Sequence, residues 1–157
     1  MKKMILIGAA LLSTLISFNS MAQRNMSPEE MAAMATANRQ AVFKLLAFSM
    51  GPLQGMARGG DFDQAVATKA LERIQMLAPM IPELFAASQT TTFDIETRAL
   101  HSIWTDMDGF ASDASDLATG ATEALAIINS QGADGVRAAV QLVGPKCGAC
   151  HDAFRAE

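Results

Sequence analysis

The C-terminal part of the sequence has an apolar spacing that constrains the fold more than any other feature of the chain. Apolar side chains recur there at intervals of 4, 3, 4, 3 and 4 residues, at Val136, Val140, Val143, Cys147, Cys150 and Phe154. This alternation places them along one face of an α-helix and is typical of helices packed in a bundle. We therefore expect a helix from Asp134 to the C-terminus. Pro145 lies within it and is expected to kink or restart the helix around Gly144.

A second helix is expected near the N-terminus, where the signals for a helix start are complete. Ser27 is suited to be the N-cap, and Pro28 follows at the first helical position. Glu30 stands three residues after Ser27 and can close a capping box. The helix should run to about Met50 or beyond, with Gly51 and Pro52 loosening its end.

Two more helices are expected between these. The earlier one should be capped by Asp61 or its neighbour and end at Pro79 and Pro82. Its inward residues are expected to be Phe62, Val66, Leu71, Ile74 and Leu77. The later one should start near Thr105 and end before Gly132, with an inward face of Phe110, Ala114, Leu117, Ala121, Leu125 and Ile128. Residues 83–104, with 88–92 at their centre, form the least regular stretch. Four helices with short connections at two of three junctions predict an all-α fold, an antiparallel four-helix bundle.

The first 22 residues have the layout of a secretory signal peptide. Lys2 and Lys3 form a positive start, residues 4–18 are largely apolar, and Ser20 and Ala22 provide small residues for cleavage. The apolar stretch is too short to span a bilayer comfortably, although an uncleaved membrane anchor is the alternative interpretation. We expect removal of residues 1–22, leaving residues 23–157 as one bundle domain.

The charge of the exported chain argues against two classes of partner. The sequence has 12 basic and 16 acidic residues, and loss of Lys2 and Lys3 leaves a net charge of about −6. A modestly acidic surface argues against binding to nucleic acid or to anionic membranes. After cleavage of the signal peptide, no segment is long and apolar enough for a transmembrane helix.

The two cysteines belong to the motif that carries the chemistry. Cys147, Cys150 and His151 form a C-x-x-C-H arrangement, which is typical of covalent attachment of c-type haem. On a helix the two thiols share one side, and His151 follows Cys147 by four residues, so its imidazole can reach the iron. The alternatives are a redox-active dithiol, a zinc site using His101, and a structural cysteine pair.

A stripe on the first helix is the candidate for the opposite side of the iron. It consists of Arg39, Phe43, Leu46 and Met50, and plain core packing would also explain it. Phe43 cannot ligate iron, whereas Met50, Met31 or Met34 could do so in principle. Arg39 would need a partner if buried, such as the haem propionates, or it could lie at the surface.

The sequence resembles cytochrome c prime, the class II c-type cytochromes of the bacterial periplasm, over essentially the whole exported chain. The matching segments are 38–44, 103–106 and 147–155. The resemblance implies a four-helix bundle with the haem motif near its C-terminus, a periplasmic location, and a homodimer formed through the first two helices.

The resemblance also assigns roles to individual residues. It implies that Cys147 and Cys150 carry the thioethers of one haem c and that His151 is the iron ligand. The other matching positions lie around the haem: Arg39 and Gln40 at its edge and propionates, Arg155 beside the proximal imidazole, and Phe43 facing the open side of the iron. Relatives with low-spin iron place a methionine where Phe43 stands, so Phe43 favours five-coordinate, high-spin iron.

These features predict a haem protein that binds nitric oxide and carbon monoxide and takes part in electron transfer with an unidentified periplasmic partner. Phe43 and Leu46 should make an apolar pocket that discriminates against oxygen and anions. No catalytic turnover is expected, because the sequence offers no arrangement of nucleophile and general base. The alternatives are a low-spin electron carrier with a methionine ligand and a structural module in which the bundle matters more than the haem.

Overall fold

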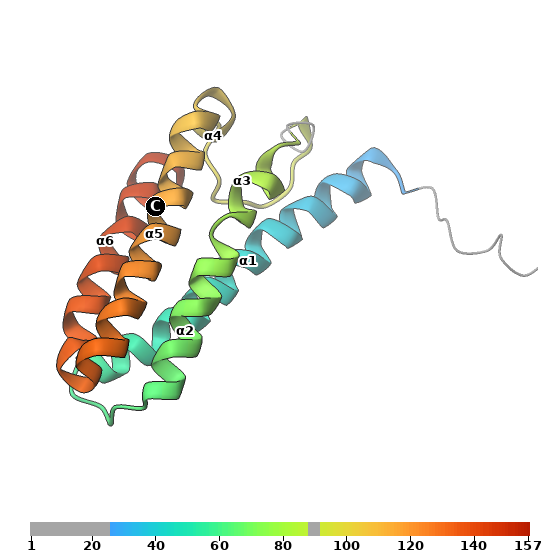
Figure 1. Cartoon of the computed structure of the whole chain (residues 1–157). Coiled ribbons are helices and arrows are strands. Elements are labelled where there is room, and N and C mark those ends of the chain that lie inside the picture. Colours follow the sequence, from blue (N-terminus) through green and yellow to red (C-terminus); the bar gives the residue numbers. More distant parts are fainter. Residues whose placement is uncertain (1–25, 88–91) are drawn as a thin grey trace, which may run out of the picture.

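The computed structural model describes residues 26–87 and 92–157, so the expected signal peptide and residues 88–91 of the irregular stretch lie outside the described residues. The described helices are α1 (Pro28–Ala57), α2 (Gln64–Leu77), α3 (Met80–Phe85), α4 (Ser102–Thr105), α5 (Met107–Gln131) and α6 (Val136–Phe154), with a 3₁₀ turn, η2 (Gly132–Gly135), before α6. The four long helices form an antiparallel bundle, in which α5 and α6 lie side by side and α1 and α2 form the other pair (Figure 1). The all-α fold is confirmed.

α1 begins as its sequence predicts and runs further than its glycine and proline suggest. The backbone N–H of Glu30 donates to Ser27 Oγ at 3.2 Å, and the N–H of Ser27 donates to Glu30 Oε2 at 2.8 Å, which is a complete capping box. The helix continues through Gly51 and Pro52 to Ala57. Glycine lacks the Cβ that would crowd the proline ring, which removes part of the usual penalty for helix before proline.

α2 is a helix as predicted, but its cap and part of its buried face differ from the prediction. Its cap is Asp63, whose Oδ1 accepts from the N–H of Val66 at 3.0 Å. Val66 is 40% exposed, so its predicted inward position is wrong. Ala67 and Ala70 are buried instead, because they share one helix face with Leu71 and Ile74, whereas Val66 precedes Leu71 by five residues and lies off that face. Beyond α2, Pro82 does not end a helix but lies within α3.

α5 and α6 pack closely along their length, and a glycine of α5 allows their backbones to approach each other. Gly120 of α5 is buried, and a Cβ there would lie 3.3 Å from the carbonyl oxygen of Leu142, so glycine permits this approach.

α6 is continuous from Val136 to Phe154. The predicted restart at Pro145 is therefore wrong. Pro145 is exposed and follows Gly144, so its ring meets neither a neighbouring helix nor a preceding Cβ.

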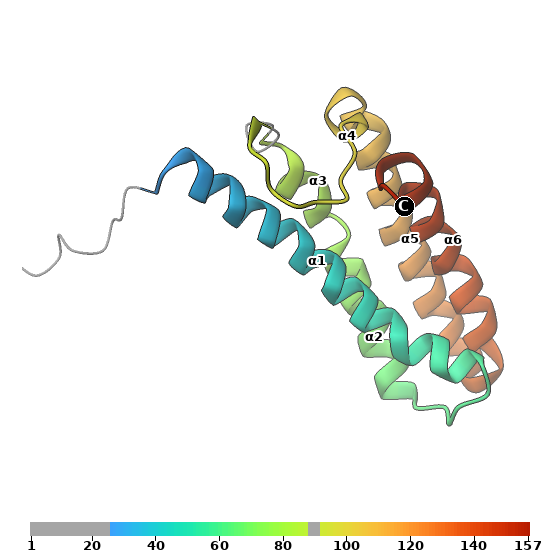
Figure 2. The same cartoon turned by 180° about the vertical axis from the view of Figure 1, so that it is seen from behind.

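The C-terminal end of α6 is tied to the segment that precedes α4. The N–H of Leu100 donates to the carbonyl of Phe154 at 3.0 Å, and the N–H of Ala156 donates to the carbonyl of Arg98 at 2.8 Å. These bonds lie on either side of an isolated antiparallel β-bridge between Ala99 and Arg155. At this end of the bundle α1 diverges from α5 and α6. The described residues of the segment 78–106, which connects α2 to α5 and contains α3 and α4, lie between them (Figure 2). We call this segment the crossover. No helix in the described part of the chain is long and apolar enough to cross a membrane.

Candidate functional site

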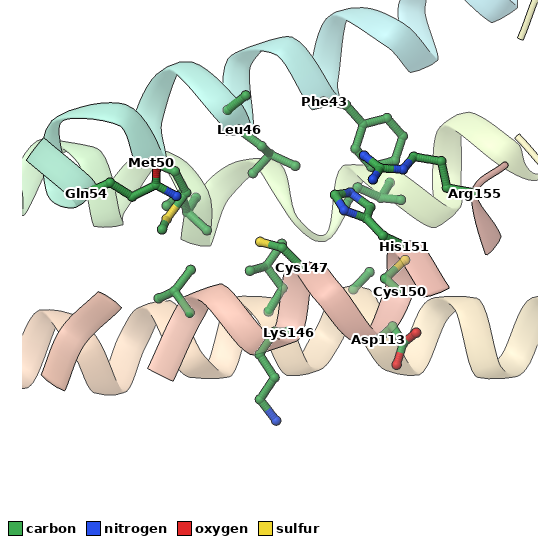
Figure 3. A pocket seen from close by; sticks show the side chains of 16 residues that line it. Phe43, Leu46, Met50, Gln54, Asp113, Lys146, Cys147, Cys150, His151 and Arg155 are labelled. Atoms are coloured by element: carbon green, nitrogen blue, oxygen red, sulfur yellow. The ribbon is translucent and has the colours of Figure 1, made fainter. Parts of the chain in front are cut away.

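Cys147, Cys150 and His151 lie on the last turns of α6, on the side that faces α1 (Figure 3). The regular helix places the two thiols three residues apart on one side, as the spacing predicted. The cysteines are not joined in a disulfide. Both are half-buried rather than fully buried in the bundle core, because they border a cavity.

Burial in the site shifts the pKa values of the two cysteines and of His151 toward their uncharged forms. Burial raises the pKa of Cys147, and it raises the pKa of Cys150 to about 11 with smaller contributions from Asp113 and Cys147. Burial is also the largest cause that lowers the pKa of His151, followed by the charge of Arg155, while Asp152 acts in the opposite direction. A lowered pKa favours the neutral imidazole, which is the form that binds a metal.

Two adjoining cavities surround His151. The first has a volume of about 280 Å³ and lies between α1, α5 and α6, and the second has about 430 Å³ and extends toward α3 and the segment before α4. Both are lined by Phe43, Ala47, Cys150, His151 and Arg155. The side chains of Phe43 and His151 therefore stand at the junction of the two cavities, one from each wall (Figure 3).

The stripe predicted on α1 forms one wall of this site. Phe43, Leu46 and Met50 line the first cavity, and Leu46 and Met50 are buried. Met31 and Met34 are exposed near the start of α1 and line neither cavity. Of the three methionines considered as iron ligands, Met50 alone reaches the site.

Arg39 is buried, with 5% of its surface exposed, so its interpretation as a surface residue is wrong. Its Nε donates to the carbonyl of Leu84 and its Nη2 to the carbonyl of Ala87, both at 2.8 Å. The guanidinium also lies 4.7 Å from the ring centroid of Phe85 and 5.4 Å from that of Trp104. Burial lowers the pKa of Arg39. These contacts fix the start of the crossover against α1 while Arg39 borders the second cavity.

The remaining predicted site residues also meet at the second cavity. Gln40 lines it from an exposed position, and its Nε2 donates to the carbonyl of Glu96 at 3.2 Å. Arg155 lines both cavities. Sequence reasoning missed Lys44 and Arg98, which also line the second cavity, and Asp113, which lines the first.

The lining of the two cavities fits haem c. The first is mainly apolar and borders both thiols and the imidazole. The described lining of the second contains four cationic side chains and no carboxylate, the cations being Arg39, Lys44, Arg98 and Arg155. An apolar macrocycle with two carboxylate groups at one edge matches this distribution. The zinc alternative finds no support, since no three His, Cys, Asp or Glu side chains of the described residues are grouped to hold a metal ion.

The family model described as Cytochrome C′ matches residues 34–155, which include both walls of this site. The chain belongs to the cytochrome c′ family. It is 30% identical over 148 residues to cytochrome c-554 of Cereibacter sphaeroides, covering 93% of this chain and 94% of that protein. It is 32% identical over 118 residues to a cytochrome c-556 of Agrobacterium tumefaciens, covering 74% of this chain and 93% of that protein.

The solved structures agree with this assignment. Cytochrome c′ from Rhodopseudomonas palustris superposes with a TM-score of 0.71 at 33% identity, covering 78% of this chain and 96% of that one. Cytochromes c′ carry covalently attached haem c, and the single C-x-x-C-H motif at 147–151 provides for one such group. The chain is therefore a haem c protein of the cytochrome c′ family.

Proposed function

We propose that this protein is a periplasmic cytochrome that binds nitric oxide or carbon monoxide and takes part in electron transfer rather than catalysing a reaction. When bound, haem c supplies an iron atom that can accept or give up one electron and can hold a small molecule at a coordination position that the protein leaves open. In this proposal Cys147 and Cys150 hold the haem covalently, and His151 is the iron ligand from the chain.

The position of Phe43 is the observation on which the proposed open coordination position depends. Phe43 stands opposite His151 at the junction of the two cavities, and its side chain has no atom that can ligate iron. Met50 lies seven residues further along α1, which is about 10 Å along the helix axis. This separation supports a haem in which no side chain opposite His151 occupies the sixth position.

The walls of the first cavity set the preference among small ligands. Phe43 and Leu46 offer no hydrogen-bond donor, and the one amide side chain in the described lining of the first cavity, Gln54, is eleven residues or about 16 Å beyond Phe43 along α1. Bound oxygen gains negative charge and needs a donor, whereas nitric oxide and carbon monoxide depend on one less. We therefore expect the site to select these two gases over oxygen and anions.

The cationic lining of the second cavity supports one orientation of the cofactor. Arg39, Gln40 and Arg98 provide donors and positive charge at that end, which suits the propionate carboxylates. Arg155 lines both cavities with His151, and its charge contributes to the lowered pKa of that imidazole. These placements support the roles proposed for Arg39 and Gln40 at the haem edge and for Arg155 beside the imidazole.

Absorption spectra of the matured protein in both oxidation states test this proposal. We expect the broad bands of high-spin iron, and a large change when carbon monoxide or nitric oxide is added to the reduced protein. The alternative function, a low-spin electron carrier, would use Met50, which is buried and lines the first cavity. Sharp low-spin bands and no response to either gas would favour that alternative.

Export and self-association complete the proposal. Cleavage after Ala22 should give a periplasmic protein that begins at Gln23, which N-terminal sequencing of the purified protein would test. The expected homodimer finds support in an exposed apolar patch on the outside of α1 and α2. It includes Phe48 and Met76, which are 64% and 69% exposed, and Leu45. Apolar surface of this kind is typical of protein interfaces.

A further inference from the structure

Asp113 lies in the haem site and has no part in the function proposed above. It belongs to α5, is half-buried, and lines the first cavity with Cys147 and Cys150. Figure 3 shows its side chain beside Cys150, on the wall opposite α1. Among the described residues that line the two cavities, Asp113 alone carries a carboxylate.

No cation of the described chain neutralises this carboxylate by direct contact. Asp113 forms neither a hydrogen bond nor an ion pair with a described residue. Lys146 lines the same cavity from α6, but its Nζ pairs with Asp116 at 3.6 Å, and both side chains of that pair are exposed. Arg155 also lines the cavity and is exposed. Solvent screens such exposed charges more than the charge of a half-buried carboxylate.

The position of Asp113 places its charge close to the haem attachment. Its side chain lines the first cavity together with Cys147, Cys150 and His151. A negative charge there disfavours an electron added to the haem, because like charges repel with a strength set by their distance and by the surrounding medium.

We propose that Asp113 sets the reduction potential of the haem by stabilising the ferric state. Reduction transfers one electron from a donor to the ferric centre, with no bond formed or broken and no proton required. The centre thereby loses one positive charge, and the attraction that Asp113 exerts on it is lost. A carboxylate on the cavity wall therefore lowers the potential, in the same way that net charge and burial tune other haem proteins.

A redox titration of the matured protein with soluble mediators tests this inference through Asp113→Asn, which keeps the size of the side chain and removes its charge. We expect the ferrous-to-ferric ratio at a fixed ambient potential to rise severalfold. A tenfold rise corresponds to about 59 mV for a one-electron couple. Asp113→Glu should keep a potential near that of the unchanged protein, because it restores the carboxylate.

The matched control is Glu123→Gln on the same helix. Glu123 is exposed, lines neither cavity, and lies ten residues or about 15 Å along α5 from Asp113, beyond the Debye length of about 8 Å at physiological salt. We expect no shift in this variant. An unchanged potential in Asp113→Asn, or an equal shift in Glu123→Gln, would overturn the inference.

The inference rests on the haem attachment proposed above, and the same samples separate the two. Haem staining of a denaturing gel shows whether the haem is covalently bound in each variant. If the unchanged protein carries no covalent haem, the proposed function fails and the inference fails with it. If it carries haem and the potentials do not differ, only the role of Asp113 is overturned.

Discussion

The side chains of Phe43 on α1 and His151 on α6 line the same two cavities, one from each side of the junction between them. Local sequence fixes each residue on its own helix, but the bundle brings them together. Because an imidazole can bind iron and a phenyl ring cannot, we expect this pair to determine what the haem site can do.

Replacing Phe43 by methionine should change the coordination of the iron. The thioether would stand opposite His151, where methionine is a known partner of histidine in cytochromes c. We expect Phe43→Met to shift the reduced protein from broad high-spin bands to sharp low-spin bands, and to slow binding of carbon monoxide at least tenfold. Phe43→Leu is the control, and it should remain high-spin. Unchanged bands in Phe43→Met would mean that this position does not face the iron.

The cysteine pair should be required for covalent retention of the haem. We expect the intact protein to have the mass of residues 23–157 plus one haem, and the double variant Cys147→Ala, Cys150→Ala to have the mass of the polypeptide alone. Mass spectrometry of periplasmic material checks this directly. Gly148→Ala is a suitable control, since a Cβ at Gly148 meets no neighbouring atom within 4 Å. Haem attached to the double variant would contradict the assignment of the thiols.

Arg39 should contribute to stability through its contacts with the crossover. Its two hydrogen bonds to the carbonyls of Leu84 and Ala87 come from a buried charged donor, and such bonds contribute about 1.5–3 kcal/mol each. We expect Arg39→Gln to lower the free energy of unfolding by about 2–4 kcal/mol. Urea titration should show a lower midpoint with an unchanged slope.

The control for Arg39 is Arg73→Gln. Arg73 is exposed and its guanidinium lies 5.6 Å from the ring centroid of Phe48, a contact whose loss should cost about 1 kcal/mol or less. Equal midpoints for Arg39→Gln and Arg73→Gln would show that the contacts of Arg39 with the crossover do not stabilise the fold.

The exposed patch on α1 and α2 should hold the proposed dimer together. A carboxylate at the centre of an apolar interface is costly to bury, so Phe48→Glu should give a monomer at micromolar concentration. Sedimentation velocity would measure this. Leu100→Glu introduces the same charge at another exposed apolar position, outside α1 and α2, and should leave the dimer intact. If Phe48→Glu remains dimeric, the interface lies elsewhere.

The helices themselves were predictable because their signals are local. The capping box at Ser27 and Glu30 and the spacing of 3 and 4 in α6 depend only on neighbouring residues. The predicted restart at Pro145 was wrong for a reason that is also local: the preceding Gly144 has no Cβ to crowd the proline ring. The inward position of Val66 was wrong because Val66 precedes Leu71 by five residues, a spacing that puts it off the helix face that Leu71 shares with Ile74.

The composition of the site was less predictable, because it depends on how distant segments meet. The motif at Cys147, Cys150 and His151 is visible in the sequence. Asp113 belongs to a helix without any recognisable motif, and Arg98 to the irregular stretch, so nothing local marks either of them as lining the haem site. The carbonyl partners of Arg39 come from positions 84 and 87, which spacing along α1 could not reveal.

Electron paramagnetic resonance of the ferric, matured protein tests the central claim most directly, because it reports the ligands of the iron without any added gas. With His151 as the one ligand from the chain and Phe43 on the other side, we predict the signal of high-spin ferric iron. A purely low-spin signal, with two strong protein ligands on the iron, would contradict the open position and the gas binding that depends on it.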